Sequence, residues 1–477
     1  MKNFLYKNRQ GVVFVMQVAL YVLLLVTLFL LLGINNPQIL RLSRTTAIML
    51  FTFVVSQYLL MQIYGKFDIG VRKSKPIIIS VLLSTLFADA ITFIVLIIMN
   101  TNETTDNQVY PYLVSDILRT VVAYLIQAGI IVGFTYGGHS IYFSFVPPEN
   151  CLIISPRATS VTPLTKAIGH YKKQYRIGEV MHIEDEGLKD AILRHDSVFL
   201  YNLSHKEAAE LLQFAYSHRK NVYRSMEVAD LVTNTSRIML LDDKSILNST
   251  FKEKNMHQRI VKRLADIVIS LVGMIICAPF VGIVAIAIKL EDGGKVFFKQ
   301  QRVTIGGRFF QVYKLRSMKE NADGSMVKKE KDGRITRVGY VIRKFRFDEV
   351  PQFINVFKGD MSIVGPRAEM ADRVFINTQR LPEYAYRYSM KAGLTGYAQI
   401  YGKYNTPAKD KLTLDLTYIQ TFSLWNDTKI LFQTILVLLR PDKSTEAYNK
   451  FEELEQKKTL EKVQKEVRKG TKNKENK

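Results

Sequence analysis

Four apolar stretches occupy the first third of the chain and set the expected architecture. They cover residues 12–32, 45–63, 76–99 and 120–136, and most are close to the roughly 20 residues that a helix needs to cross a bilayer. The first stretch is too long for the core of a signal peptide, and further apolar stretches follow it. We therefore expect a transmembrane domain at residues 1–145, with four membrane-spanning helices that remain in the mature protein.

The basic residues around these stretches predict their orientation. They precede the first stretch and separate the second from the third: Lys2, Lys7, Arg9, Lys66, Arg72, Lys73 and Lys75. The loop at residues 100–111 contains none, although Arg41 and Arg44 weaken the pattern in the first outer loop. By the positive-inside rule, both ends of the bundle lie in the cytoplasm, so the rest of the chain begins there.

Polar residues stand inside the apolar stretches, among them Asp89 in the third and Gln17 in the first. Polar groups in a membrane are energetically costly, so they could mark a path for a substrate or ion. Hydrogen bonding between helices, or a position close to the membrane surface, would explain them equally well. The sequence leaves both interpretations open.

The pattern changes at residues 146–250, where short β-rich runs alternate with helical stretches. The runs are Cys151 to Ser155, Ser197 to Leu203 and Ile238 to Leu241, and residues 205–220 form the clearest helix. This alternation predicts a small Rossmann-like α/β domain with a parallel sheet. No glycine-rich turn follows the first run, so we expect a degenerate domain that binds no dinucleotide.

A fifth apolar stretch, at residues 264–290, is long enough to cross a bilayer as a straight helix. Pro279 near its middle removes an intrahelical hydrogen bond and crowds the preceding turn. Basic residues flank both ends, as expected if both ends stay on the cytoplasmic face. We predict a re-entrant helix broken at Pro279, with a fifth span as the alternative.

Composition adds a partner class to this picture. The 477 residues carry a formal net charge of +23, which suits either nucleic acid or an anionic membrane surface. The apolar stretches favour the membrane, and the basic residues lie at membrane edges and beside glycine turns rather than among aromatic platforms. We therefore expect a lipid bilayer and no nucleic acid as partner. The two cysteines exclude a disulfide scaffold and a CxxC metal framework.

The candidate chemistry lies between Arg302 and Asp427, where glycine, arginine and carboxylates are concentrated. Arginine forks match phosphate oxygens, and glycine lets backbone donors approach them. Asp348 and Glu349 stand just before Pro351, so we predict that a helix begins there with Asp348 as its cap. A carboxylate held near phosphorus acts as a nucleophile or a metal ligand, whereas the plainer interpretation is an ordinary helix cap.

These residues resemble a known family, the bacterial sugar transferases, and within it the monotopic phosphoglycosyl transferases. The resemblance covers about residues 259–439, and it rests on these residues in order: Lys262, Arg263, Asp266, Pro279, Tyr313 to Met318, Asp348 to Gln352, Asn355, Val356, Gly359 to Arg367, Gly393 to Gln399, Asp415 and Tyr418. Four preceding spans and a degenerate Rossmann-like domain are similar to the long members of the family. The sequence departs from the usual pattern at Ala278, before the proline, and at Ala368, after Gly-Pro-Arg.

The resemblance implies an activity: transfer of a sugar-1-phosphate from a UDP-sugar to undecaprenyl phosphate, with release of UMP. Such enzymes require Mg²⁺ and begin exopolysaccharide, capsule or O-antigen synthesis on the cytoplasmic face of the bacterial inner membrane. Carried over by position, Asp348 is the nucleophile, and Glu349 is its acid/base or metal-supporting partner. Arg343 and Arg367 would contact phosphate. Weaker candidates for binding are Lys314, Arg316 and Ser362.

The expected organisation is therefore a transmembrane domain at 1–145, an α/β domain at 146–250, a catalytic domain at 256–440 and a charged tail at 441–477. The alternative function is a non-catalytic, membrane-anchored assembly or regulatory protein of polysaccharide export. The dense charge around the Asp-Glu pair argues against it. The motifs name neither the sugar nor the oligomeric state, so a homodimer remains open.

Overall fold

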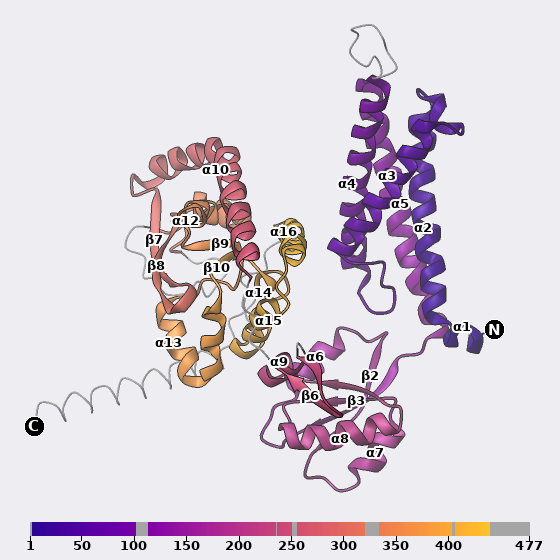
Figure 1. Ribbon diagram of the computed structural model, residues 1–477, viewed down its shortest axis with the longest axis vertical. Coiled ribbons are helices and arrows are strands. Elements are labelled where there is room, and N and C mark those ends of the chain that lie inside the picture. Colours follow the sequence, from indigo (N-terminus) through magenta and orange to yellow (C-terminus); the bar gives the residue numbers. More distant parts are fainter. Residues whose placement is uncertain are drawn as a thin grey trace, which may run out of the picture. The chain divides into compact units, whose positions relative to one another are not determined.

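The computed structural model describes residues 2–101, 113–234, 236–249, 255–319, 333–402 and 406–438. Contacts divide the chain into two compact units, Met1–Ser225 and Met226–Lys477. The protein is a mixed helix and sheet protein, and its described part contains five helices long and apolar enough to cross a membrane (Figure 1). The predicted limits of the four parts stay predictions, and the tail at 441–477 lies outside the described residues.

Four of the long helices form a bundle in the first unit. After the short helix α1 (Lys2–Lys7) they are α2 (Arg9–Gly33), α3 (Arg44–Tyr64), α4 (Ser74–Thr101) and α5 (Leu113–Phe145), with a short 3-10 helix η1 (Pro37–Leu40) between α2 and α3. Leu20, Leu24 and Leu28 of α2 are fully buried between helices, whereas Phe14 and Phe51 are largely exposed. Large apolar side chains directed outward are typical of helices whose solvent is lipid.

The rest of the first unit is a four-stranded sheet of order β2-β1-β3-β4 in which every neighbouring pair is parallel. Its elements are β1 (Glu149–Ser155), α6 (Thr162–Gly169), β2 (Tyr175–His182), α7 (Leu188–Arg194), β3 (Ser197–Leu200), α8 (His205–Ser217) and β4 (Asn221–Arg224). The parallel sheet predicted from the alternating pattern is confirmed. After β1 the chain continues through Arg157, which forms an ion pair with Asp185.

One strand predicted for that sheet lies elsewhere. Residues Arg237–Leu241 form β5, which pairs antiparallel with β6 (Lys244–Asn248) and belongs to the second unit. The helix before it, α9 (Val228–Asn234), places Leu231 in the core of the second unit. Periodicity identified the strand but could not identify its partner, because a tight two-residue turn lets the next strand pair first.

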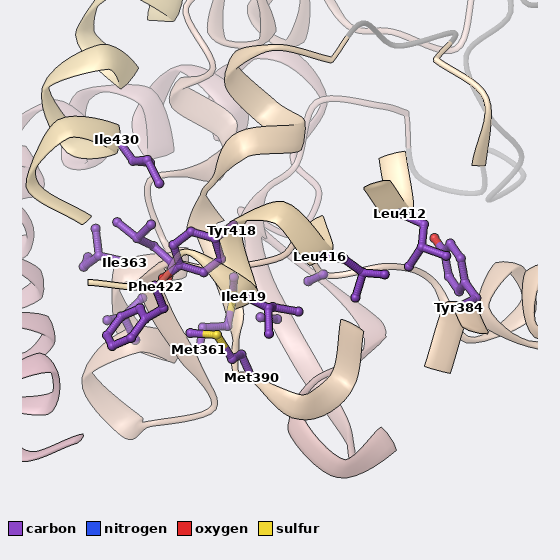
Figure 2. Packing of buried hydrophobic residues seen from close by; sticks show 14 of the residues in the cluster. Met361, Ile363, Tyr384, Met390, Leu412, Leu416, Tyr418, Ile419, Phe422 and Ile430 are labelled. Atoms are coloured by element: carbon purple, nitrogen blue, oxygen red, sulfur yellow. Dashed lines mark hydrogen bonds between the residues drawn. The ribbon is translucent and has the colours of Figure 1, made fainter. Parts of the chain in front are cut away.

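The second unit contains many short elements around one core. They are α10 (Met256–Asp292), β7 (Phe297–Val303), η2 (Ile305–Gly307), β8 (Phe309–Leu315), α11 (Arg337–Lys344), η3 (Phe347–Glu349), α12 (Gln352–Lys358), β9 (Met361–Val364), α13 (Ala371–Arg380), η4 (Pro382–Ser389), β10 (Ala392–Thr395), α14 (Tyr397–Ile400), α15 (Ala408–Gln420) and α16 (Leu424–Leu438). Figure 2 shows Met361, Ile363, Tyr418 and Phe422 packed together at the centre.

Strands β9 and β10 form a parallel pair beside this core and fix the Gly-Pro-Arg segment. A Cβ atom at Gly365 would lie 2.4 Å from the carbonyl oxygen of Lys391, and one at Gly393 would lie 2.1 Å from the nitrogen of Gly365. Only glycine permits such an approach of two backbones. The two glycines therefore hold the segment that leads into Arg367 against β10.

Helix α10 continues through Pro279 without a change of secondary structure, and Figure 1 shows that it bends along its length. The expected separation into two pieces is therefore a bend within one helix, the usual effect of an internal proline. Before Pro279, Ile269 packs on the main core and Gly273 faces the ring of Phe353. After Pro279, Ile288 packs with residues of β8 and α11. Both halves of the helix thus contact the same unit.

Candidate functional site

The Asp-Glu pair lies in a tight turn between two helices. It ends η3, the single 3-10 turn that follows α11 and precedes α12. Arg346, just before this turn, has a φ of 54°, a left-handed conformation that non-glycine residues rarely adopt. The capping position of α12 is Pro351, so the prediction that Asp348 caps this helix is wrong. Pro351 begins the helix because its fixed φ suits that place.

Glu349 is the best-paired member of the dyad. Its Oε1 accepts a hydrogen bond from Nζ of Lys314 on β8 at 2.9 Å, and another from Nη2 of Arg367 at 3.2 Å. Burial would raise the pKa of this carboxyl, but the charges of Lys314 and Arg367 outweigh burial and hold its pKa below the usual range. Glu349 is therefore an ionised carboxylate that joins β8 to the segment after β9.

Asp348 lies in a different electrostatic setting. Burial, together with the neighbouring charge of Glu349, raises its pKa from the ordinary 3.8 to about 6, while Lys314 and Arg343 act in the opposite direction. At neutral pH a group with that pKa is roughly nine-tenths ionised. Asp348 is thus a poorly solvated carboxylate that remains available as a base or nucleophile.

The structure adds to the cluster an arginine that the sequence analysis gave only as the limit of the candidate region, without a role. Arg302, the penultimate residue of β7, donates from Nη1 to the carbonyl oxygen of Ala368 at 3.0 Å. Burial and the positive charges of Arg367 and Arg373 lower its pKa to about 10, and the neighbouring Glu349 and Glu369 oppose this effect. A buried arginine beside further cations is typical of a site that receives an anion. The signal was weak in sequence, because Arg302 lies 46 residues before the dyad in a polar strand.

Two predicted binding residues lie outside this cluster. Arg316 donates from Nη1 to Oδ2 of Asp292 at 2.8 Å and is only 8% exposed. Ser362 is buried and donates from Oγ to Oδ1 of Asp266 at 3.0 Å. In these positions Arg316 ties β8 to the end of α10, and Ser362 ties β9 to its beginning. The structure brings together Lys314, Arg343, Asp348, Glu349 and Arg367, and a role for Arg316 and Ser362 in phosphate binding stays a prediction.

A second charged cluster, centred on Arg387, holds the backbone of the Arg367 segment. Arg387 of η4, 2% exposed, pairs through Nη2 with Oδ2 of Asp415 at 2.6 Å and donates from the same atom to the backbone oxygen of Arg367 at 2.8 Å. Its Nη1 donates to the hydroxyl of Tyr384 at 2.5 Å and lies 3.9 Å from Oε1 of Glu369. Arg367 is thus held at its backbone by Arg387, while its side chain reaches Glu349.

The dyad also offers the ligand chemistry of a hard cation. The described residues contain no group of three or more histidine, cysteine or carboxylate side chains that could hold a metal by itself. Mg²⁺, however, commonly takes one or two protein carboxylates and completes its shell with substrate phosphates and water. Asp348 and Glu349 fit such a partial shell, since both are carboxylates of one turn.

The fold and the site define a membrane protein whose second unit carries a pair of carboxylates. Lysine and arginine side chains that could bind phosphate surround this pair. Residues 257–441 match the family described as bacterial sugar transferase. The chain belongs to this family, because it also covers most of two relatives that are well above 30% identical to it. The recognition made from the motifs is confirmed.

Three relatives show how the family match is distributed. A UDP-glucose:undecaprenyl-phosphate glucose-1-phosphate transferase of Caulobacter vibrioides is 42% identical over 188 residues, which are 38% of this chain and 70% of that protein. The exopolysaccharide production protein PSS of Rhizobium leguminosarum bv. phaseoli is 38% identical over 188 residues, 37% of this chain and 94% of that protein. A UDP-N-acetylgalactosamine-undecaprenyl-phosphate N-acetylgalactosaminephosphotransferase of Aeromonas hydrophila is 43% identical over 184 residues, 38% of this chain and 44% of that protein. The chain therefore spans less than half of the Aeromonas protein's length.

Proposed function

We propose that this protein transfers a sugar-1-phosphate from a UDP-sugar to undecaprenyl phosphate and releases UMP. The reaction would be the first membrane step in the synthesis of an exopolysaccharide, a capsule or an O-antigen. The names of the Aeromonas hydrophila and Caulobacter vibrioides relatives support the acceptor and the class of reaction, and the name of the Rhizobium leguminosarum relative supports a role in exopolysaccharide production. The observation that carries the proposal is the placement of Asp348, a raised-pKa carboxylate, beside Glu349 with its cations Lys314 and Arg367.

The proposed chemistry proceeds in two displacements at one phosphorus atom. A carboxylate oxygen of Asp348 attacks the phosphorus that carries the sugar, its bond to the bridging oxygen breaks, and UMP leaves with that oxygen. An oxygen of undecaprenyl phosphate then attacks the same phosphorus, the aspartyl bond breaks, and Asp348 returns as a carboxylate. Two steps suit this pair of substrates, because one is water-soluble and the other lies in the membrane.

The cations around the dyad have a specific task in this scheme. A diphosphate brings at least two negative charges to the site, and carboxylate oxygens would repel it. Lys314, Arg367 and Arg302 offset that repulsion, and the arginine fork can bind two phosphate oxygens at once. Mg²⁺, held by Asp348 and Glu349 with the substrate phosphates, would supply further neutralisation of charge.

Glu349 acts as a support in this proposal rather than as an acid. Its lowered pKa means that it keeps no proton to donate near neutral pH. Its hydrogen bonds instead hold Lys314 and Arg367 in place beside Asp348. This favours the supporting role over the acid/base role among the two expected from the sequence.

We further infer that α2 to α5 span the membrane and that α10 enters and leaves on the cytoplasmic side of the bacterial inner membrane. The support is packing on both sides of Pro279. Asp266, before it, accepts hydrogen bonds from Ser362 and Ile363, and Phe280, after it, lies against Phe347 with ring centroids 6.3 Å apart. A straight spanning helix would carry its two ends to opposite faces, about 30 Å apart, where one unit could not contact both.

The reaction is tested by exchange without lipid. Purified full-length protein with Mg²⁺, labelled UMP and a panel of UDP-sugars should form labelled UDP-sugar before any undecaprenyl phosphate is added, because the first displacement is reversible. Asp348→Asn should abolish both exchange and transfer. Asp360→Asn is the matched control, since Asp360 pairs with Arg308 outside the dyad cluster.

Each alternative has its own result. Transfer without exchange in the unaltered protein, or substantial transfer by Asp348→Asn, would favour direct attack by the lipid phosphate. If no sugar in the panel supports exchange or transfer, the non-catalytic assembly protein becomes the better explanation.

The topology is tested separately by cysteine labelling. Met256→Cys and Lys295→Cys, each in a background without Cys151 and Cys277, should both be shielded from an impermeant thiol reagent in whole cells. Both should react once the membrane is opened. Labelling of only one of the two positions in whole cells would show that α10 crosses the bilayer.

A further inference from the structure

A band of polar side chains crosses the interior of the helix bundle in the first unit. Gln57 of α3, Thr85 and Asp89 of α4, and Gln127 of α5 are each at most 2% exposed. Gln127 Nε2 donates to the backbone oxygen of Leu24 in α2 at 3.0 Å and to Oδ1 of Asp89 at 3.5 Å. Gln57 Nε2 donates to Oγ1 of Thr85 at 3.4 Å. All four helices therefore contribute to the band.

These residues also lie at one depth of the bundle. Thr85 and Asp89 are four residues apart on one helix, so their side chains occupy the same face on adjacent turns, with Cβ atoms roughly 5–6 Å apart. Gln57 is hydrogen-bonded to the first and Gln127 to the second. The two amides and the carboxylate thus gather within about one helical turn.

The band contains more acceptors than donors. Among the described residues, Oδ2 of Asp89, Oε1 of Gln57 and Oε1 of Gln127 are buried without a hydrogen-bond partner. The donor groups of both glutamines are already directed elsewhere in the band. A buried acceptor without a partner costs about 1–3 kcal/mol, and a charged one costs more.

The other buried aspartate of the bundle has hydrogen-bond partners for both of its carboxylate oxygens. Asp116 of α5 accepts hydrogen bonds from Nδ2 of Asn35 and Nδ2 of Asn36, both at 2.7 Å, and lies 3.7 Å from Arg119. Within the described part of the chain, Asp89 has one long hydrogen bond, from Gln127, and no such cation. The four apolar stretches at 12–32, 45–63, 76–99 and 120–136 contain no lysine, arginine or histidine that could serve.

We propose that this band is a binding site for a monovalent alkali cation. Three unpartnered oxygens need a positive partner that can contact several of them, and a single proton on Asp89 would supply a donor for only one. One carboxylate balances one positive charge, whereas sites for divalent cations generally gather several carboxylates. Carboxylate, amide and hydroxyl oxygens are the ligands that hard cations take.

The site is tested by ion substitution on the full-length protein in lipid nanodiscs. Thermal midpoints, together with hydrogen–deuterium exchange of α4 peptides, are compared in NaCl, in KCl and in N-methyl-D-glucamine chloride at equal ionic strength. One or both alkali cations should raise the midpoint and slow exchange in α4, because binding to the folded state alone stabilises it. The effect should saturate with concentration.

Substitutions assign the effect to the band. Asp89→Asn keeps the shape and should remove the difference between the salts. Gln57→Met should raise the half-maximal cation concentration roughly tenfold, the effect of losing one ligand. Asp116→Asn is the matched control, and it should lower the midpoint while keeping the difference between the salts.

Three results would overturn the proposal. They are equal midpoints of the unaltered protein in all three salts, a response to pH with no response to the cation, and a salt difference that Asp89→Asn retains. The second result would assign the band to a protonated carboxyl group. The salt comparison on the unaltered protein decides the matter even if Asp89→Asn does not fold.

Discussion

Two charged clusters lie close together in the second unit. They differ in their exposure to solvent and in how completely their charged groups are paired. The cluster around Glu349 is partly open, since Arg367 has a side chain 45% exposed. The cluster around Arg387 is closed, with Arg387 and Asp415 exposed by 2% and 1%. Both join arginine to carboxylate. The difference in exposure distinguishes a site that a ligand can reach from a buried cluster that is part of the scaffold.

The balance of charge makes the same distinction. In the open cluster, Lys314, Arg367 and Arg302 surround a carboxylate pair, so that one more anion can be accepted. In the closed cluster, Arg387 faces both Asp415 and Glu369, and burial raises the pKa of Asp415 to about 6 despite the charge of Arg387. Burial raises the pKa of Asp348 to the same value, so the clusters differ in exposure and in pairing rather than in the pKa of this carboxyl group.

Removing the cation of the closed cluster should have the largest effect. Arg387→Met removes the buried ion-pair partner of Asp415 and should destabilise the second unit by about 3–5 kcal/mol. The measurement is the thermal unfolding midpoint of the purified protein. Arg308→Met is the control, since Arg308 pairs with Asp360 at 57% exposure and should change the midpoint little. Equal losses in both variants would contradict the distinction between the clusters.

Changing the arginine of the open cluster should affect activity rather than folding. Arg367→Lys keeps the charge but loses the two-pronged contact with phosphate and with Glu349, so the rate of transfer should fall roughly 100-fold. Initial rates with undecaprenyl phosphate measure this, and the midpoint should stay within about 1 °C of the unaltered value because the position is half exposed. A large fall in the midpoint would make Arg367 a scaffold residue.

A smaller loss is expected at the supporting carboxylate. Glu349→Gln retains an oxygen that can accept from Lys314 or Arg367 but loses the charge, so transfer should fall about tenfold and the exchange of UMP should persist. The ratio of the rates in Glu349→Gln and Asp348→Asn is the decisive quantity. If Glu349→Gln is as inactive as Asp348→Asn, the two carboxylates share one role and the division between them is wrong.

The last effect concerns pH and stability. Because the folded-state pKa of Asp348 is raised from 3.8 to about 6, its contribution to stability is fully present below about pH 4 and is lost as pH rises through 6. An asparagine side chain does not ionise, so the Asp348→Asn variant does not lose this stability as the pH rises. The variant should therefore unfold at a higher temperature than the unaltered protein at pH 7.5, with the difference shrinking towards pH 4. A constant difference across this range would exclude titration of Asp348 as its cause.

The sequence identified the open cluster better than the closed one, for a physical reason. Asp348 and Glu349 are adjacent in the sequence just before Pro351, and Arg367 directly follows Gly365 and Pro366, so their chemistry can be interpreted locally. Arg387 stands in a tyrosine-rich stretch that could equally belong to a surface helix. Only tertiary packing brings its side chain to the backbone oxygen of Arg367. Burial, which turns a common arginine into a structural one, cannot be read from neighbouring residues.

The same limit explains the other differences. The apolar stretches predicted all five long helices, because membrane-compatible length and hydropathy are local properties. The pairing of β5 with β6, and the contacts of Arg316 with Asp292 and of Ser362 with Asp266, depend on which segments meet in space. The resemblance to the family made Arg316 and Ser362 weaker candidates for binding by position, and a position in the sequence does not show these contacts.

The bend in α10 has a consequence for the membrane itself. In the proposed topology, this helix occupies volume in the cytoplasmic leaflet only, with large exposed side chains such as Ile275, Ile283 and Ile286 among the acyl chains. A wedge in one leaflet expands that leaflet relative to the other, so the protein should insert more favourably where the cytoplasmic leaflet is loosely packed or convexly curved. Lipid composition would then act on this protein mechanically, through lateral pressure, apart from any part that a lipid has in its chemistry.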